Sequence, residues 1–128
     1  MAEKICELMK KGGAGSAKVD SGFVTISTST STKVTTGFKP SFVCVYGTKS
    51  TTQASVMVYS KETRDGYTFQ AGKNGSATGG SYYTLPNTQS GNGYINSIND
   101  DGFTISGYGS TAYAAYTDNG KVFYVAVE

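Results

Sequence analysis

Residues 118–127 read DNGKVFYVAV and hold the clearest structural signal in the chain. Asn119-Gly120 stands between two strand-like runs, residues 113–117 and 121–127, and predicts a tight hairpin with positive φ at the turn. The unbroken apolar run from Val122 to Val127 predicts a strand covered on both faces, either in the centre of a sheet or under a neighbouring subunit. We therefore expect Phe123 to be a core aromatic whose truncation to Ala costs about 3–5 kcal/mol.

Working outward from this strand, two more runs are apolar at every position. Residues 42–46 (FVCVY) and 56–59 (VMVY) predict strands with both faces covered. Shorter strands are expected at residues 82–85, 94–98 and 103–105. The Ser/Thr run at residues 27–32 fits either a disordered spacer or a polar edge strand.

Turn-forming residues, mainly Gly, Pro, Asn and Asp, separate these runs and predict turns and loops. Gly37-Phe38-Lys39-Pro40 predicts a corner, because Pro40 biases the preceding residue away from helix. Turns are expected at Asp65-Gly66, Asn74-Gly75 and Asp100-Asp101-Gly102. Residues 72–80 and 86–93, rich in Gly, Ser, Thr and Asn, predict exposed loops.

Composition supports the same architecture. Serine and threonine fill a quarter of the 128 residues, Gly contributes 17 and Tyr 10, and charged residues are only 16%. This composition favours many short strands joined by tight turns. We expect one domain of eight to ten strands: an all-β, antiparallel β-sandwich with a jelly-roll-like layout.

The first residues differ from the rest. Residues 2–11 (AEKICELMKK) predict a short amphipathic helix, and Gly12-Gly13 predicts its end. The expected organisation is an anchoring helix at 1–12, a Gly-rich linker at 13–22 and a β-sandwich domain at 23–128. Particle attachment or oligomerisation is assigned to Ile5, Leu8 and Met9; the alternative is that this helix folds back on its own sheet.

Catalytic signals are weak. The chain has no His, which removes Ser-His-Asp and Cys-His systems and the usual zinc ligand. A carboxylate pair for glycoside hydrolysis is the remaining enzymatic alternative, with candidates at Glu62, Asp65, Asp100, Asp101 and Asp118. Asp100-Asp101 suits either a hard cation or a solvated turn. We expect no enzyme and no catalytic, cofactor-binding or metal-binding residues.

Other general classes are also disfavoured. The net charge is +2 and the lysines are scattered, so nucleic acid is not an expected partner. No run is long and apolar enough to cross a membrane, and the N-terminus lacks a signal-peptide core. The two cysteines, Cys6 and Cys44, suit a reducing compartment, and Cys44 is expected to be a buried small hydrophobe.

Tyrosine is the most suggestive residue type for binding, because it offers a flat apolar face and a hydroxyl. Rings near loop-rich segments are candidates for contact with a surface glycan: Tyr82, Tyr83, Tyr94 and Tyr108. The competing interpretation is that these rings fill the core and the cross-strand pairs.

Three segments resemble a family of small virion proteins of phages and prophages. They are residues 36–46 (TGFKPSFVCVY), the later DGFTI at 101–105 and the closing VFYVAVE at 122–128. The resemblance implies a head fibre, a capsid decoration protein or a tail or baseplate appendage, often a homotrimer, with no active site. It implies assembly in the bacterial cytoplasm, location in the virion, and contacts with itself, other virion proteins and a host glycan. The alternative is a free-standing carbohydrate-binding module, against which stands the absence of Trp.

Overall fold

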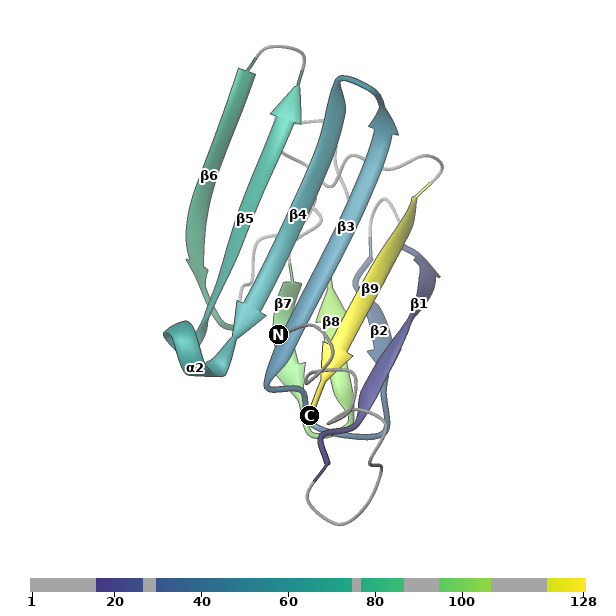
Figure 1. Cartoon of the computed structure of the whole chain (residues 1–128), viewed down its shortest axis with the longest axis vertical. Helices are drawn as coiled ribbons and strands as arrows, with labels where there is room; N and C mark the ends of the chain where they lie inside the picture. The colour runs from purple at the N-terminus through teal and green to yellow at the C-terminus, as the bar shows by residue number, and fades with distance from the viewer. Residues whose placement is uncertain (1–15, 27–29, 75–76, 87–94, 107–119) are drawn as a thin grey trace.

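The computed structural model describes residues 16–26, 30–74, 77–86, 95–106 and 120–128. Within these ranges the chain forms nine strands and one short helix. The strands make two antiparallel sheets, with orders β1-β9-β3-β4-β5-β6 and β2-β8-β7. The smaller sheet lies behind the lower half of the larger one (Figure 1). The expected all-β antiparallel sandwich is confirmed.

The larger sheet contains strands β1 (Val19–Thr25), β9 (Lys121–Val127), β3 (Phe42–Ser50), β4 (Gln53–Ser60), β5 (Tyr67–Asn74) and β6 (Ala77–Thr84). The smaller sheet contains β2 (Thr32–Thr35), β8 (Gly102–Ile105) and β7 (Ile95–Asn99), and helix α2 (Lys61–Arg64) joins β4 to β5. The chain crosses between the sheets four times, and β3 to β6 form a meander within one sheet. These four crossings are the only feature of the described strands that matches the expected jelly-roll-like layout.

The core lies between the two sheets. Successive side chains on a strand point to opposite faces, so every second residue of β3, β4 and β9 faces inward. These inward residues include Val43, Val45, Met57 and Val122, and they are fully buried or nearly so. From the smaller sheet they meet Val34, Ile95, Phe103 and Ile105.

Several turns are as expected. Gly66 and Gly120 have positive φ values of 76° and 77°. Asn74 pairs with Ala77 across the β5–β6 connection, so the chain turns between these residues, one residue later than a two-residue turn at Asn74-Gly75. Thr32–Thr35 forms β2, an edge strand that includes only the last residue of the Ser/Thr run at 27–32, and residues 30 and 31 are not strand.

Some boundaries were wrong. Strand β1 begins at Val19, so residues 19–22 belong to the sheet and not to a linker. Residues 72–74 and 77–80 are strand, not exposed loop, because their backbones pair across the β5–β6 hairpin in spite of the glycines. The expected helix at 1–12, with Ile5, Leu8 and Met9, lies outside the described residues.

The predicted hairpin at 118–120 lies partly outside the described residues. Strand β9 pairs with β1 along its whole length and with β3 from Phe123 to Val127. Both edges of β9 are therefore occupied over those residues by strands from distant parts of the chain. Gly120 has the positive φ expected of the turn, and the expected run at 113–117 lies outside the described residues.

Candidate functional site

The side of the larger sheet that faces away from the core is unusually apolar. Residues directly opposite each other in an antiparallel pair share a face, so the register defines rows across the sheet. One row on this side contains Phe23, Phe123, Tyr46, Val56 and Ala71. The next contains Val125, Cys44, Val58, Phe69 and Tyr82. We call this side of the larger sheet the outer face.

The outer face is open among the described residues. Phe23 is 67% exposed, Tyr46 48%, Tyr82 52% and Phe123 37%. The apolar runs 42–46, 56–59 and 122–127 were expected to be covered on both faces. In the described structure the smaller sheet covers one face of these strands. Cover of the other face by a neighbouring subunit stays a prediction. Phe123 is not a core residue, because the inward positions of β9 are Val122, Tyr124 and Ala126.

Aromatic pairs form a ridge on the outer face at β1 and β9. The Phe23 and Phe123 rings meet edge to face with centroids 5.3 Å apart. The Lys121 ammonium lies 4.4 Å from the Phe23 ring centroid. By register, Lys121 at the start of β9 is on this side, and position 73 near the end of β5 lies opposite Ala54. Both positions lie toward the same end of the strands, so the two central rows of the face contain no charged residue.

A shallow hollow of about 460 Å³ lies on the other half of the outer face. Its lining includes Tyr46, Val56, Phe69 and Ala71, together with Gly79 and Gly80 of β6. A Cβ at position 80 would lie 2.9 Å from Cζ of Phe69, so a larger residue there would have to displace that ring. The hollow suits an apolar side chain better than a polar ligand, since polar atoms are scarce in its wall.

A second aromatic cluster borders the hollow beside α2. The Phe69 and Tyr82 rings lie 5.2 Å apart. The Arg64 guanidinium lies 4.2 Å from the centroid of Tyr67 and 4.9 Å from that of Tyr82. Helix α2 positions this arginine at the end of β4, where its charge stays at the border of the apolar surface.

The tyrosines proposed for glycan contact do not form one platform. Tyr82 points to the outer face. Its neighbour on β6, Tyr83, pairs with Thr68 and points to the other face of the sheet. Tyr94 and Tyr108 lie outside the described residues.

Cys44 lies in the middle of the outer face and is half-buried, not enclosed in the core as expected. Burial raises the pKa of its thiol, so the thiolate is scarce at neutral pH. The alternation of β3 explains the correction, because Val43 and Val45 occupy the inward positions.

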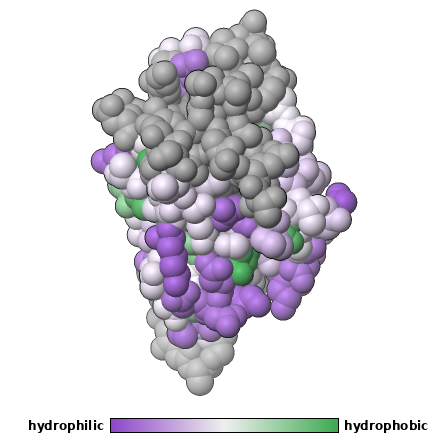
Figure 2. Space-filling model, turned by 180° about the vertical axis from the view of Figure 1, so that it is seen from behind, coloured by the Kyte–Doolittle hydropathy of each residue, from purple (hydrophilic) through white to green (hydrophobic). Residues whose placement is uncertain are grey.

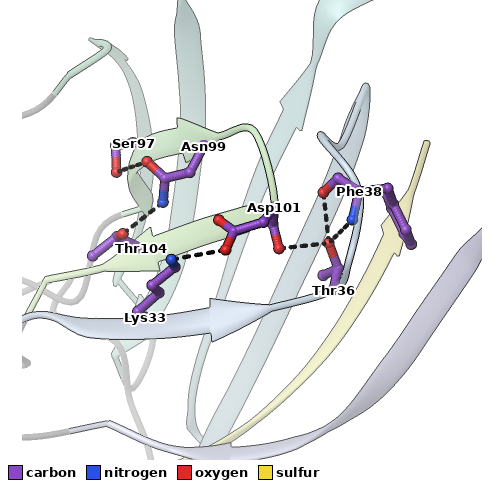
Figure 3. Close-up of polar contacts among 7 residues, drawn as sticks. All are labelled: Lys33, Thr36, Phe38, Ser97, Asn99, Asp101 and Thr104. Carbon is purple, nitrogen blue, oxygen red and sulfur yellow. Dashed lines mark hydrogen bonds and ion pairs between the residues drawn. The ribbon is translucent and has the colours of Figure 1, made fainter.

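Two of the candidate carboxylates, Asp65 and Asp101, have structural partners. Asp65 Oδ1 accepts hydrogen bonds from the Tyr59 hydroxyl and from the Gly66 amide, each at 2.9 Å. Asp101 pairs with Lys33 at 3.0 Å (Figure 3). Its backbone oxygen accepts from the amides of Thr36 and Gly37, which ties the β7–β8 turn to the end of β2.

The two other acidic candidates within the described residues, Glu62 and Asp100, are exposed and do not form a catalytic pair or a cation site there. Asp100 is fully exposed and lies 3.9 Å from the Lys39 ammonium. Glu62 is exposed on α2, and Asp118 lies outside the described residues. No group of three His, Cys, Asp or Glu side chains within the described ranges could hold a metal ion.

The opposite side of the molecule differs in character. Seen from behind, the described part of the surface is mainly hydrophilic (Figure 2). The large apolar side chains that are exposed in the described chain all lie on the outer face by register: Val19, Phe23, Tyr46, Tyr82 and Phe123.

Comparison with protein-family models, with curated proteins and with solved structures finds no match for this chain. No helix in the described part of the chain has the length and hydropathy needed to cross a membrane.

Proposed function

We propose that the chain is a structural protein of a phage particle that acts through surface contacts and not through catalysis. It serves as a head fibre, a capsid decoration protein or a tail appendage. Residues 1–12 attach it to other virion proteins, and the β-domain is presented on the particle. The resemblance of residues 36–46, 101–105 and 122–128 to small virion proteins supports this role.

The observation that carries the proposal is the open outer face. A monomeric soluble protein rarely exposes a contiguous apolar patch larger than a few hundred Å², and larger patches mark contact sites. Here Phe23, Tyr46 and Phe123 lie in one row and are each more than a third exposed. A face of this kind fits a protein that is assembled with other protein surfaces.

Particle incorporation tests the proposal directly. Particles purified from the host that carries the gene should contain the chain in a fixed ratio to the major capsid or tail protein, measured by quantitative mass spectrometry. Leu8→Asp with Met9→Asp should lower that ratio at least tenfold while the β-domain stays folded. Lys4→Asp, which makes the same charge change on the polar side of residues 2–11, is the matched control. Absence of the wild-type chain from particles would overturn the proposal.

A free-standing carbohydrate-binding module is the second candidate. It is favoured by the exposed Tyr82 ring and the neighbouring Arg64 guanidinium, a pair suited to an acidic sugar. Binding to a glycan array that is lost in Tyr82→Ala, by a chain absent from particles, would favour it. The scarcity of polar groups in the hollow favours the assembly role, since sugars need directed hydrogen bonds.

A further inference from the structure

We propose that the outer face is the contact between two copies of this chain, related by a two-fold axis that runs parallel to the strands. The inference deepens the assembly role proposed above and names its partner. It rests on the shape of one row of the sheet, on the area of the face and on the absence of charge from its centre.

The row runs from a ridge to a hollow. Phe23 and Phe123 stand at one end, Tyr46 and Val56 in the middle, and Ala71 and Gly80 at the other end. A two-fold rotation about an axis between β3 and β4 reverses this order. It sets Phe123 of each copy over Ala71 of the other, and Phe23 over Gly80. The ridge of each copy thereby fills the hollow of the other, as a self-complementary two-fold contact requires.

Area favours a second copy over the N-terminal segment. Six strands about 4.8 Å apart and about 23 Å long give a footprint of roughly 550 Å², so two copies would bury about 1,100 Å² in total. That total reaches the value of about 1,000 Å² expected of a specific interface. A ten-residue helix about 15 Å long and 10 Å across would cover only about a quarter of the same face.

Electrostatics also permits self-association. The two central rows contain no charged residue, so two copies can meet there without opposing like charges. The same rotation brings the Lys121 position of one copy near the Lys73 position of the other, at the border of the face. The Lys121 side chain at this border can keep its ammonium group in water.

Charge complementation on the full chain tests the two-fold geometry. Light scattering of the wild-type chain should give the mass of two chains. Phe123→Lys and Ala71→Glu should each weaken self-association at least a hundredfold with unchanged far-UV circular dichroism. An equimolar mixture of the two variants should recover the dimer, because positions 123 and 71 then face each other with opposite charges. Thr35→Lys, on the exposed edge of the smaller sheet, should leave the dimer intact.

Chemical cross-linking through a thiol gives a second measure of where the axis lies. Cys44 lies on β3 beside the proposed axis, and packed sheets lie about 10 Å apart. In the Cys6→Ser chain, a bis-maleimide with a spacer of about 8–10 Å, matched to that separation, should link two copies through Cys44. The linked product should fall at least tenfold in Phe123→Lys.

Three outcomes would overturn the inference. They are a monomer at all concentrations, a trimer, and a dimer that both face variants leave intact. A monomer whose Cys44 is protected from maleimide until Leu8→Asp is introduced would assign the face to the chain's own N-terminal segment. Each of these results leaves the particle role testable, since incorporation is measured separately.

Discussion

The Tyr124 hydroxyl donates a hydrogen bond of 2.7 Å to Oδ2 of Asp20, and this contact joins the central strand β9 to the edge strand β1. Tyr124 lies opposite Gly22, and its ring passes over that glycine toward Asp20. The same ring meets Phe103 of the smaller sheet edge to face, with centroids 5.5 Å apart. One side chain thus connects an edge strand, a central strand and the second sheet.

Tyr124→Phe should lower the free energy of unfolding by about 1–3 kcal/mol, because a part-buried hydroxyl loses a bond to a charged acceptor. Urea denaturation of the two proteins measures the difference. Asp20→Asn keeps an acceptor oxygen and should cost less. Equal stabilities of the Tyr124→Phe and wild-type chains would show that the hydrogen bond makes no net contribution to the free energy of unfolding.

Stability should fall in strongly alkaline solution. Burial raises the pKa of Tyr124 from 10 to about 12, and the bond to Asp20 adds to the effect. Burial, together with the hydrogen bond to Asp65, also raises the pKa of Tyr59 from 10 to about 12. The folded state therefore keeps protons that the unfolded state releases near pH 10. The stabilisation is complete below pH 10 and is lost as the pH rises through 12.

Denaturation curves measured from about pH 8 to pH 12 check this dependence. The Tyr59→Phe and Tyr124→Phe variants should each show a shallower decline than the wild-type chain above about pH 10. A wild-type curve that stays flat to about pH 12 would contradict the assignment.

Gly102→Ala should destabilise the chain by about 2 kcal/mol or more, because added atoms cannot be accommodated beside fixed backbone. A Cβ at this position would lie 1.9 Å from the backbone oxygen of Val34, and φ is +157°. Thermal unfolding measures the loss. Gly22→Ala is the matched control, since its Cβ would make only ordinary contacts with Tyr124, the nearest at 3.7 Å. Similar losses in both variants would argue against the close approach of β8 to β2.

Two phenylalanines should respond very differently to truncation. Phe103 is fully buried, and Phe103→Ala should cost about 3–5 kcal/mol. Phe123 is 37% exposed, and Phe123→Ala should cost only about 1 kcal/mol in chains too dilute to associate. Urea denaturation at low protein concentration compares them. A loss at Phe123 as large as that at Phe103 would mean that the outer face is covered within one chain.

Much of the fold was predictable from local signals. The apolar runs at 42–46, 56–59 and 122–127 all lie in strands, and the turns at Gly66 and Gly120 have the positive φ that their sequences require. These features depend on side-chain alternation and on glycine, which act over a few residues. Only the last part of strand β1, from Phe23 onward, was predicted. The first part was assigned to a linker because Asp20 and Gly22 are typical of loops, and only the pairing with β9 makes them strand.

The sequence by itself determined the class of the fold, since β-branched residues, tyrosines and glycine turns leave an antiparallel sandwich as the consistent solution. Only the tertiary structure decided which side of each apolar strand is buried. The runs in β3, β4 and β9 are apolar at every position, so their pattern does not distinguish inward from outward residues. The pairing of β9 with β1 and β3 sets that choice, because it turns Val122 and Tyr124 toward the smaller sheet and leaves Phe123 on the outer face.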